Sequence, residues 1–247
     1  MSGRRLELTG IEPIEVWDLP VDGRPLHDWR DTPELADHLA TLAIGLRAAP
    51  PTTLRPAALA LARRFERVHV MGGAVDRSFA DAIRARGLPC SFDADAFTPA
   101  RVGARHHRGR CVDVGQSAIK IAEDDRCRRI ARDPLRAPLR DEVAPTDRAR
   151  ARESTLAFLA ESIRGASRVL LALPCEPTSD GLPSGCTYAW RDPDPDLVPS
   201  LEARTGAAIE WVNDAELAAL AASRALPPGP STLVLTLGFS VGAALLG

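Results

Sequence analysis

Apolar runs of strand length alternate with segments of helical periodicity along most of the chain. Buried strands are predicted at residues 67–71, 110–114, 169–173, 208–212 and 232–237. Between these runs, the apolar residues of 35–46 and of 156–163 recur at the spacing of one helix face. Strands that alternate with helices are typical of the α/β class, and this is the fold class that we predict.

Glycine and proline predict where these elements turn and end. Gly115 and Gly238 each lie between two strand-like runs, so each predicts a hairpin. Thr32 followed by Pro33 predicts the start of a helix, with the threonine hydroxyl as its cap. The sequence Pro-Pro-Gly-Pro at residues 227–230 predicts a stiff linker that can act as a hinge between two lobes.

Composition narrows the possible partners and compartments. The chain has 247 residues, 45% of them hydrophobic, and a net charge of −2. This charge gives no general attraction to nucleic acid or to an anionic membrane, so we expect neither as a partner. No apolar stretch approaches the roughly 18 residues needed to cross a bilayer, and the first residues lack the apolar core of a signal peptide, so we expect a cytoplasmic protein.

The cysteines predict neither a disulfide scaffold nor a structural zinc site. Their number is odd, and no two of them have the Cys-x-x-Cys spacing. They are Cys90, Cys111, Cys127, Cys175 and Cys186.

The first candidate for chemistry is the segment Cys-Val-Asp-Val-Gly-Gln-Ser-Ala-Ile-Lys at residues 111–120. Asp113, at the end of a strand and before a glycine turn, can hold a metal ion through water. The backbone N–H groups of the turn can face a phosphate, and Ser117 can add a hydroxyl donor. Lys120 is the only lysine in the chain. An ordinary hairpin explains the same residues.

Three other positions repeat the design of a strand followed by a polar or glycine turn. Gly238 lies at the bend of residues 233–242, and Gly72 and Gly73 follow the strand at 67–71, where glycines permit close approach of a flat ligand. Tight turns are the alternative for both. Asp214 follows the strand at 208–212 and can accept a proton from a substrate hydroxyl, although a helix N-cap is the other explanation.

Four segments, taken together and in order, resemble motifs of the ROK family of sugar kinases, within the superfamily of actin and Hsp70 ATPases. Residues 111–120 resemble the first phosphate motif, Asp-x-Gly-Gly-Thr-x-x-Lys. Residues 170–190 resemble its Gly-x-Pro-Gly, Asp-Gly and Asn-Leu-x-Trp series, and residues 213–220 resemble Asn-Asp-Ala-x-x-Ala-Ala-Leu. Residues 233–242 resemble the second phosphate motif, Leu-x-Leu-Gly-Thr-Gly-Val-Gly-Gly-Gly.

In that family the second phosphate motif lies mid-chain, whereas here it lies at the end of the sequence. The first hundred residues of this chain resemble the segments that follow this motif in the family. The resemblance therefore implies a circularly permuted, two-lobed actin-like ATPase fold, which is ribonuclease H-like. One expected lobe comprises residues 1–98 and 229–247, on the sugar and adenosine side, and the other comprises residues 99–228. The segments concerned are 4–10 for the third strand of the sheet, 14–21 for sugar binding, 67–73 for adenosine binding and 99–104 for the last helix.

The resemblance implies an ATP-dependent kinase for a sugar or a sugar-like polyol such as a cyclitol, with Asp214 as the base and Mg²⁺ held by Asp113 through water. Expected phosphate and nucleotide contacts are Asp113, Gly115, Gln116, Ser117, Lys120, Gly238, Phe239, Ser240, Gly72 and Gly73. Expected sugar contacts are Glu176, Asn213, Glu15 and Asp18. Members of the family often pair, which makes a homodimer the candidate assembly.

Departures from the family pattern keep a second reading open. Phe239 replaces the threonine of the second phosphate turn, and Gln116 replaces a phosphate-loop glycine. These changes favour a non-catalytic nucleotide- or sugar-binding protein of the same fold, whereas the retained Asp113 and Asp214 favour the kinase. The cysteine-rich zinc motif of the family is missing, so no zinc is expected. A ROK-like repressor would need a helix-turn-helix arm, and residues 1–30 predict strands and turns instead.

Overall fold

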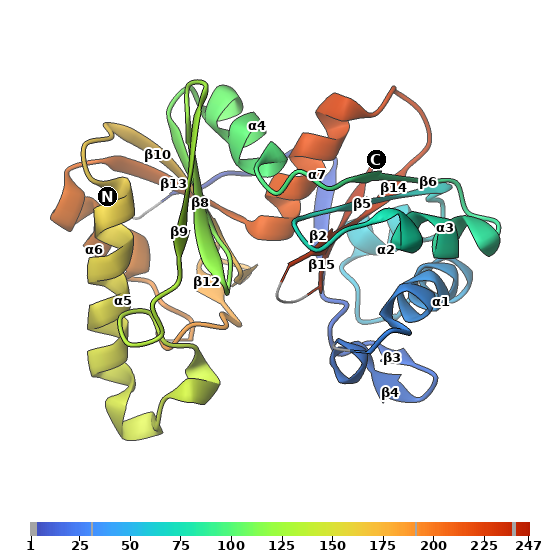
Figure 1. The fold of residues 1–247 in the computed structure, drawn as a ribbon, viewed down its shortest axis with the longest axis horizontal. Coiled ribbons are helices and arrows are strands. Elements are labelled where there is room, and N and C mark those ends of the chain that lie inside the picture. The colour runs from blue at the N-terminus through green and yellow to red at the C-terminus, as the bar shows by residue number, and fades with distance from the viewer. Residues whose placement is uncertain (1–3, 31, 191, 239–240) are drawn as a thin grey trace. The chain divides into compact units, whose positions relative to one another are not determined.

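The computed structural model describes residues 4–30, 32–190, 192–238 and 241–247, which form a mixed α/β protein. The chain divides into two compact units (Figure 1). Unit 1 comprises residues 1–7 and 99–217, and unit 2 comprises residues 8–98 and 218–247. Each unit has its own sheet and its own hydrophobic core.

Unit 1 is built on a six-stranded sheet in the order β1-β13-β10-β7-β8-β9. Strands β7, β8 and β9 form an antiparallel meander, and β10 and β13 then continue the sheet parallel to β7. The strands are β1 (Arg4–Arg5), β7 (Arg110–Val114), β8 (Ala118–Glu123), β9 (Arg126–Ala131), β10 (Arg168–Leu173) and β13 (Ala208–Asn213).

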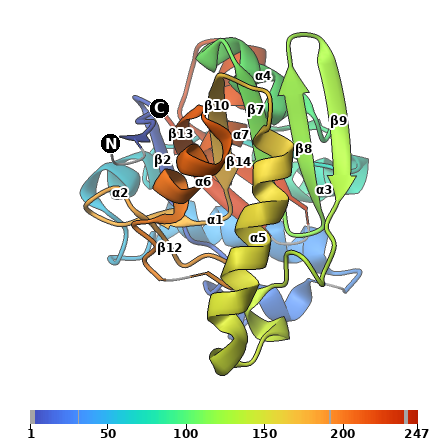
Figure 2. The ribbon, with the colours of Figure 1, turned by 90° about the vertical axis from the view of Figure 1, so that its left-hand side faces the viewer.

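Helices cover this sheet because its central strands are apolar on both faces. The core beneath α5 (Arg148–Ile163) and α6 (Leu197–Thr205) contains the inward side chains of β7, β8, β10 and β13, and both helices lie over the same face (Figure 2). On α4 (Thr98–His107), a side chain at Gly103 would meet Cys111 Sγ at 2.7 Å and Leu217 at 2.8 Å. A glycine is therefore needed where α4 packs onto the sheet.

Unit 2 is built on a five-stranded sheet in the order β2-β15-β14-β5-β6. Strands β14, β15 and β2 form an antiparallel meander, and β5 and β6 continue the sheet parallel to β14. The strands are β2 (Ile11–Ile14), β5 (Arg67–Met71), β6 (Cys90–Asp93), β14 (Thr232–Leu237) and β15 (Val241–Leu246). The order and directions of these five strands match those of β9-β8-β7-β10-β13 in unit 1.

Three helices pack on one face of the unit 2 sheet, namely α1 (Leu35–Ala48), α2 (Pro56–Ala62) and α3 (Arg77–Ala85). Their apolar residues share one core with strands β5, β14 and β15. The helix α7 (Asp214–Ala225) begins in unit 1 and continues into unit 2. Smaller elements are β3 (Pro20–Val21), β4 (Arg24–Pro25), β11 (Glu176–Pro177), β12 (Pro183–Ser184) and short 3-10 turns at Leu26–Trp29, Arg140–Glu142 and Pro145–Asp147.

The α/β class predicted from the sequence is confirmed, and several finer expectations are wrong. The third strand of the unit 2 sheet is β2, Ile11–Ile14, and not residues 4–10, because Arg4–Arg5 pairs with β13 in unit 1. Thr32 does not cap α1, since its hydroxyl donates to the Trp29 carbonyl. The 227–230 linker lies within unit 2, where Arg67 binds the Pro227 carbonyl, and the unit boundary falls at residues 217 and 218.

Among the described residues, no helix combines the length and the apolar character needed to span a membrane.

Candidate functional site

Two carboxylates lie at the carboxyl ends of the parallel strands of unit 1. Asp113 is the second-last residue of β7 and is in register with Ala172 of β10. Asn213 ends β13 opposite Leu173 of β10, and Asp214 follows it as the first residue of α7. In sheets with parallel strands, the carboxyl edge is where ligands usually bind, because the loops that follow the strands converge there.

Asp113 forms an ion pair with the only lysine of the chain. The two residues are direct partners in the antiparallel register of β7 and β8, and Lys120 Nζ lies 2.6 Å from Asp113 Oδ2. Asp113 is buried, with 5% of its surface exposed. Burial disfavours the charged lysine, but the Asp113 carboxylate outweighs this and raises the pKa of Lys120 above its usual value. Lys120 therefore stays protonated across the physiological range.

Asp214 is the group with the most unusual acidity in the site. Burial, and then the negative charge of Asp113, raise its pKa from 3.8 to about 7. The Ala215 N–H and the positive charge of Lys120 act in the opposite direction without cancelling the increase. A carboxylate with this pKa can both accept and release a proton near neutral pH, which is what a general base requires.

Asn213 is the residue that caps α7. Its Oδ1 accepts hydrogen bonds from the backbone N–H groups of Ala215, at 2.9 Å, and of Glu216, at 3.3 Å. Glu216 Oε2 in turn accepts from the Asn213 N–H at 3.1 Å, which completes a reciprocal capping box. Asp214 Oδ1 also accepts from the Ala215 N–H, at 2.9 Å. Since Asn213 carries the main capping role, capping alone does not explain the carboxylate at position 214.

The turn after β7 is held from inside the protein. The Gly115 N–H donates to the Ala118 carbonyl at 3.1 Å, and an added Cβ at Gly115 would lie 3.1 Å from the same oxygen. The buried Tyr188 hydroxyl donates to the Gly115 carbonyl at 2.8 Å. Of the other predicted turn residues, Gln116 is buried and Ser117 is exposed. The side chain of Ser117 is therefore open to solvent, whereas the Gly115 carbonyl of the same turn is bound by Tyr188.

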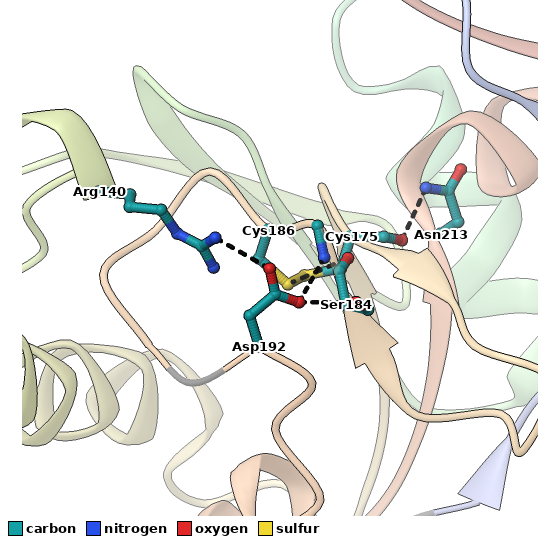
Figure 3. Close-up of a disulfide and its surroundings, with 7 residues drawn as sticks. Arg140, Cys175, Ser184, Cys186, Asp192 and Asn213 are labelled. Atoms are coloured by element: carbon teal, nitrogen blue, oxygen red, sulfur yellow. Dashed lines mark hydrogen bonds and ion pairs between the residues drawn. A yellow bond between two sulfur atoms is a disulfide. The ribbon is translucent and has the colours of Figure 1, made fainter.

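A disulfide joins Cys175 to Cys186, a pairing that the sequence prediction of no disulfide scaffold did not anticipate. Cys175 is the second residue after the end of β10, and its carbonyl accepts a hydrogen bond from Asn213 Nδ2 at 2.9 Å (Figure 3). The cysteines are 11 residues apart and meet through the small β11–β12 hairpin, a contact that sequence spacing does not reveal. Glu176, a predicted sugar contact, is exposed on this hairpin, whereas Asn213 has both ends of its side-chain amide bonded within the protein.

Unit 2 has a pocket of about 450 Å³ at the corresponding strand ends. Its lining includes Gly238, after β14, together with Ala74, Asp76, Ser78 and Phe79, which lead into and begin α3. Asp76 caps α3 by accepting from the Ser78 N–H at 2.8 Å. The pocket is within the usual volume range of small-molecule sites.

The glycines that were predicted to lie near a nucleotide differ in whether the packing of the protein requires a glycine at that position. Gly72 has a φ of +129°, and an added Cβ would lie 2.2 Å from the Leu237 carbonyl oxygen. Gly72 is therefore required by the packing of β5 against β14 whether or not a ligand binds. Gly73 and Gly238 are exposed, and an added Cβ at Gly238 would meet nothing within 4 Å.

The remaining predicted contacts lie elsewhere in unit 2. Glu15 and Asp18 are exposed, and Asp18 lies 3.5 Å from the imidazole of His27. Phe239 and Ser240 are outside the described residues. The structure thus brings together Asp113, Gly115, Lys120, Asn213 and Asp214 at one strand edge of unit 1.

Asp113 is the residue of this edge whose carboxylate could take part in holding a metal ion. Within the described parts of the chain, no three His, Cys, Asp or Glu side chains form a group that could hold a metal ion. A site with one carboxylate, such as Asp113, suits Mg²⁺, which usually takes one or two protein carboxylates and completes its shell with water and phosphate oxygens.

Sequence reasoning missed Tyr188, the disulfide and the α3 part of the pocket. The tyrosine and the cysteines act through contacts between segments far apart in the chain, and no local pattern predicts those. Asp76 could have been found, since an aspartate two residues before a serine at the start of a helical segment is a common cap.

The chain was compared with known proteins. Neither the protein-family models nor the curated protein sequences contain a match to it.

Proposed function

We propose that this chain is an ATP-dependent kinase that phosphorylates a hydroxyl of a sugar or of a sugar-like polyol, with Asp214 as the general base. The observation that carries the proposal is the position of Asp214 directly after β13, at the same strand edge as the Asp113–Lys120 pair, where burial and the Asp113 charge raise its pKa to about 7. A carboxylate that titrates near neutral pH destabilises the fold, and such residues cluster at functional sites.

The strand order supports the two-lobed, actin-like fold that the sequence resemblance implies. Each unit has a three-stranded antiparallel meander joined at its first strand to two parallel strands. In unit 2 the third strand, β2, comes from residues 11–14, whereas the first two come from residues 232–246. A circular permutation of a two-lobed ancestor accounts for this order.

Each unit, considered by itself, carries groups that suit a nucleotide. In unit 1, Asp113 would hold Mg²⁺ through water, and Lys120 and Ser117 would face the phosphates, where Mg²⁺ would neutralise negative charge when bound. In unit 2, the pocket beside Gly238 has room for a nucleoside and carries the Asp76 carboxylate and the Ser78 hydroxyl as polar groups. Of the two glycines before this pocket, Gly73 is the exposed one and is open to a ligand.

Asp214 would act on the acceptor. Its carboxylate would take the proton of the attacking hydroxyl as the new O–P bond forms, since a hydroxyl is a poor nucleophile while it keeps its proton. Asn213 and Glu216 hold the first turn of α7 and therefore fix the position of this carboxylate. Burial of the site would limit the access of water as a competing acceptor.

The test is acceptor-dependent release of ADP from Mg-ATP across a panel of hexoses and cyclitols. We expect one or more acceptors to support turnover and Asp214→Asn to lower kcat by about 100-fold or more while nucleotide binding survives. Asp124→Asn, an exposed turn residue at a positive φ that asparagine tolerates, is the matched control and should keep full activity.

The second candidate function is nucleotide or sugar binding without catalysis. The observation that favours it is the 2.6 Å contact of Lys120 with Asp113, which already neutralises the carboxylate proposed for Mg²⁺. Binding of Mg-ATP in calorimetry without turnover on any acceptor would select this candidate. If Mg-ATP does not bind at all, the kinase is wrong, and only the sugar-binding form of the second candidate is left.

A further inference from the structure

Residues 175–190 connect the two carboxylate-bearing elements of unit 1. At one end, the Cys175 carbonyl accepts from Asn213 Nδ2, and Asn213 caps the helix that begins with Asp214. At the other end, the Tyr188 hydroxyl donates to the Gly115 carbonyl, in the turn that follows Asp113. The disulfide Cys175–Cys186 closes the loop between these two contacts (Figure 3). We call residues 175–190 the brace.

The two halves of the brace are anchored very differently. The half near Cys186 is held by the Asp192 carboxylate, which accepts from Ser184 Oγ at 2.6 Å, from the Gly185 N–H at 2.9 Å and from Arg140 Nη1 at 2.9 Å. These donors lower the pKa of Asp192 to about 2, so this clamp persists at all physiological pH values. The half near Cys175 reaches Asn213 through a single carbonyl and is joined to the clamp by the disulfide and by the short β11–β12 pairing.

The brace also contains buried polar atoms whose hydrogen-bonding capacity is unused. Among the described residues, Thr187 Oγ1 and Trp190 Nε1 are buried without a hydrogen-bond partner. Such atoms cost free energy in the closed state and regain hydrogen bonds with water when the segment opens. The closed brace therefore depends on its covalent tie more than a fully bonded loop would.

From these contacts we propose that the Cys175–Cys186 disulfide is a redox-responsive positioning device for the Asp113–Lys120–Asp214 cluster. With the disulfide formed, the clamp at Asp192 fixes the Cys175 carbonyl, Asn213 and the start of α7. With the disulfide reduced, the short β11–β12 pairing still ties the Cys175 half to the clamp. This half then leaves Asn213 more readily, and Asp214 becomes more exposed to solvent. As a regulator of catalysis the proposal rests on the proposed kinase function, whereas as a structural switch it stands independently.

The chemical step is thiol–disulfide exchange with a dithiol reductant. A thiolate of the reductant attacks one sulfur, breaks the S–S bond and forms a mixed disulfide with that cysteine. The second thiol of the reductant then attacks the mixed disulfide and releases the cysteine as a thiol. Cys175 and Cys186 each gain one electron and one proton, and the reductant becomes a cyclic or paired disulfide. Both cysteines are buried, with 1% and 2% of their surfaces exposed, so attack must wait for local opening near the exposed Gly185.

The experiment compares oxidised protein, protein treated with dithiothreitol, and the double variant Cys175→Ser/Cys186→Ser. All three are made in a Cys127→Ser background, because Cys127 is an exposed free thiol. Hydrogen–deuterium exchange followed by mass spectrometry is measured over residues 113–117, 175–190 and 213–217. A carboxyl ¹³C NMR titration is measured for Asp214.

We expect the reduced protein and the double variant to exchange at least tenfold faster over residues 175–190 and 213–217, with little change in unit 2. The Asp214 pKa should fall toward the ordinary aspartate value, because solvent access relieves the burial that raises it. Tyr188→Phe, which removes only the hydroxyl, should speed exchange at residues 113–117 and leave the Asp214 pKa unchanged. Neither readout requires an active enzyme.

Unchanged exchange and an unchanged Asp214 pKa after complete reduction would overturn the switch, as would alkylation mass spectrometry that finds both cysteines free in air-oxidised protein. If the double variant does not fold, dithiothreitol treatment of the folded protein decides. For a working kinase, reduction should lower kcat at least fivefold with the KM for ATP nearly unchanged. Movement of both structural readouts in a protein without turnover would keep the switch and reject the kinase.

Discussion

The two sheets of this protein share one strand order but place different chemistry at their carboxyl edges. In unit 1 the edge is charged and tightly bonded: Asp113, Lys120 and Asp214 lie among buried strands, and a disulfide-closed loop holds both carboxylate-bearing elements. In unit 2 the edge is open, with glycine turns and a pocket of about 450 Å³. Strand order thus gives a place for a site, while the side chains decide whether that place does chemistry or accommodates a ligand.

Removing the positive charge of Lys120 from the unit 1 edge tests this contrast most strongly. Lys120→Met leaves the buried Asp113 carboxylate unpaired and should lower the free energy of unfolding by about 3 kcal/mol. The double variant Asp113→Asn/Lys120→Met should recover much of the loss, because no charge is then left buried. Urea unfolding of the four proteins in this cycle measures the coupling. A loss in the double variant equal to the sum of the two single losses would show that the pair is not coupled.

The unit 2 edge is best tested through the contact of Gly72 with the neighbouring strand. Gly72→Ala places a methyl group 2.2 Å from the Leu237 carbonyl oxygen at a φ of +129°. We expect the unfolding free energy to fall by about 2–3 kcal/mol, in the range of the more damaging single substitutions. Thermal unfolding checks this, and wild-type stability would show that β5 and β14 can separate at no cost.

The acidity of Asp214 predicts a pH dependence that is peculiar to unit 1. Its pKa is about 7 in the folded protein and about 3.8 when unfolded, so the folded state binds the extra proton between these values. The stability contributed by this group is therefore present at low pH and is lost as the pH rises through about 7. Asp214→Asn should stabilise the protein at pH 8 by about 2 kcal/mol and have little effect near pH 3.

Two measurements check this prediction. Denaturant unfolding of Asp214→Asn at both pH values gives the difference directly, with Asp124→Asn as the exposed control. Turnover of the wild-type protein should rise as the pH increases through about 7, because the base acts in its deprotonated form. A variant that is less stable than wild type at pH 8 would contradict the assignment of a strained, raised-pKa carboxylate.

The smallest expected effect belongs to Gly238, at the mouth of the unit 2 pocket. An added Cβ at this position meets nothing within 4 Å, so Gly238→Ala should change the unfolding free energy by less than about 0.5 kcal/mol. Because Gly238 lines the pocket, the same change should weaken nucleotide binding in calorimetry. Loss of stability together with unchanged binding would reverse the roles assigned to Gly72 and Gly238.

The local features of the fold could be predicted from the sequence because short-range patterns determine them. The hairpins at Gly115 and Gly238 and the apolar strand β10 follow directly from turn residues and apolar runs. Strand β9 was not predicted, because its sequence Arg-Cys-Arg-Arg-Ile-Ala is almost fully exposed at the sheet edge and lacks an apolar face. Helix α6 was missed as well, and Pro199 lies within its first turn, where proline is tolerated.

The features of the candidate site likewise divide into those that local sequence predicts and those that it does not. The pairing of Asp113 with Lys120 follows from the hairpin register, and the position of Asp214 at a helix start follows from the strand before it. The raised pKa of Asp214 depends on burial by the surrounding structure, and the disulfide depends on the β11–β12 hairpin. Neither the raised pKa nor the disulfide follows from any stretch of consecutive residues. The sequence therefore predicted the types of residue in the site but not these two features.

The pairing of β2 with β15 has a consequence for biosynthesis. Ile11–Ile14 hydrogen-bonds to residues 243–246, and the Gly247 N–H donates to the Gly10 carbonyl. During translation, the first strand of this sheet to leave the ribosome must wait for more than two hundred further residues before its neighbour exists. Until then β2 and β5 expose unpaired edges, and such edges can pair with other chains during folding.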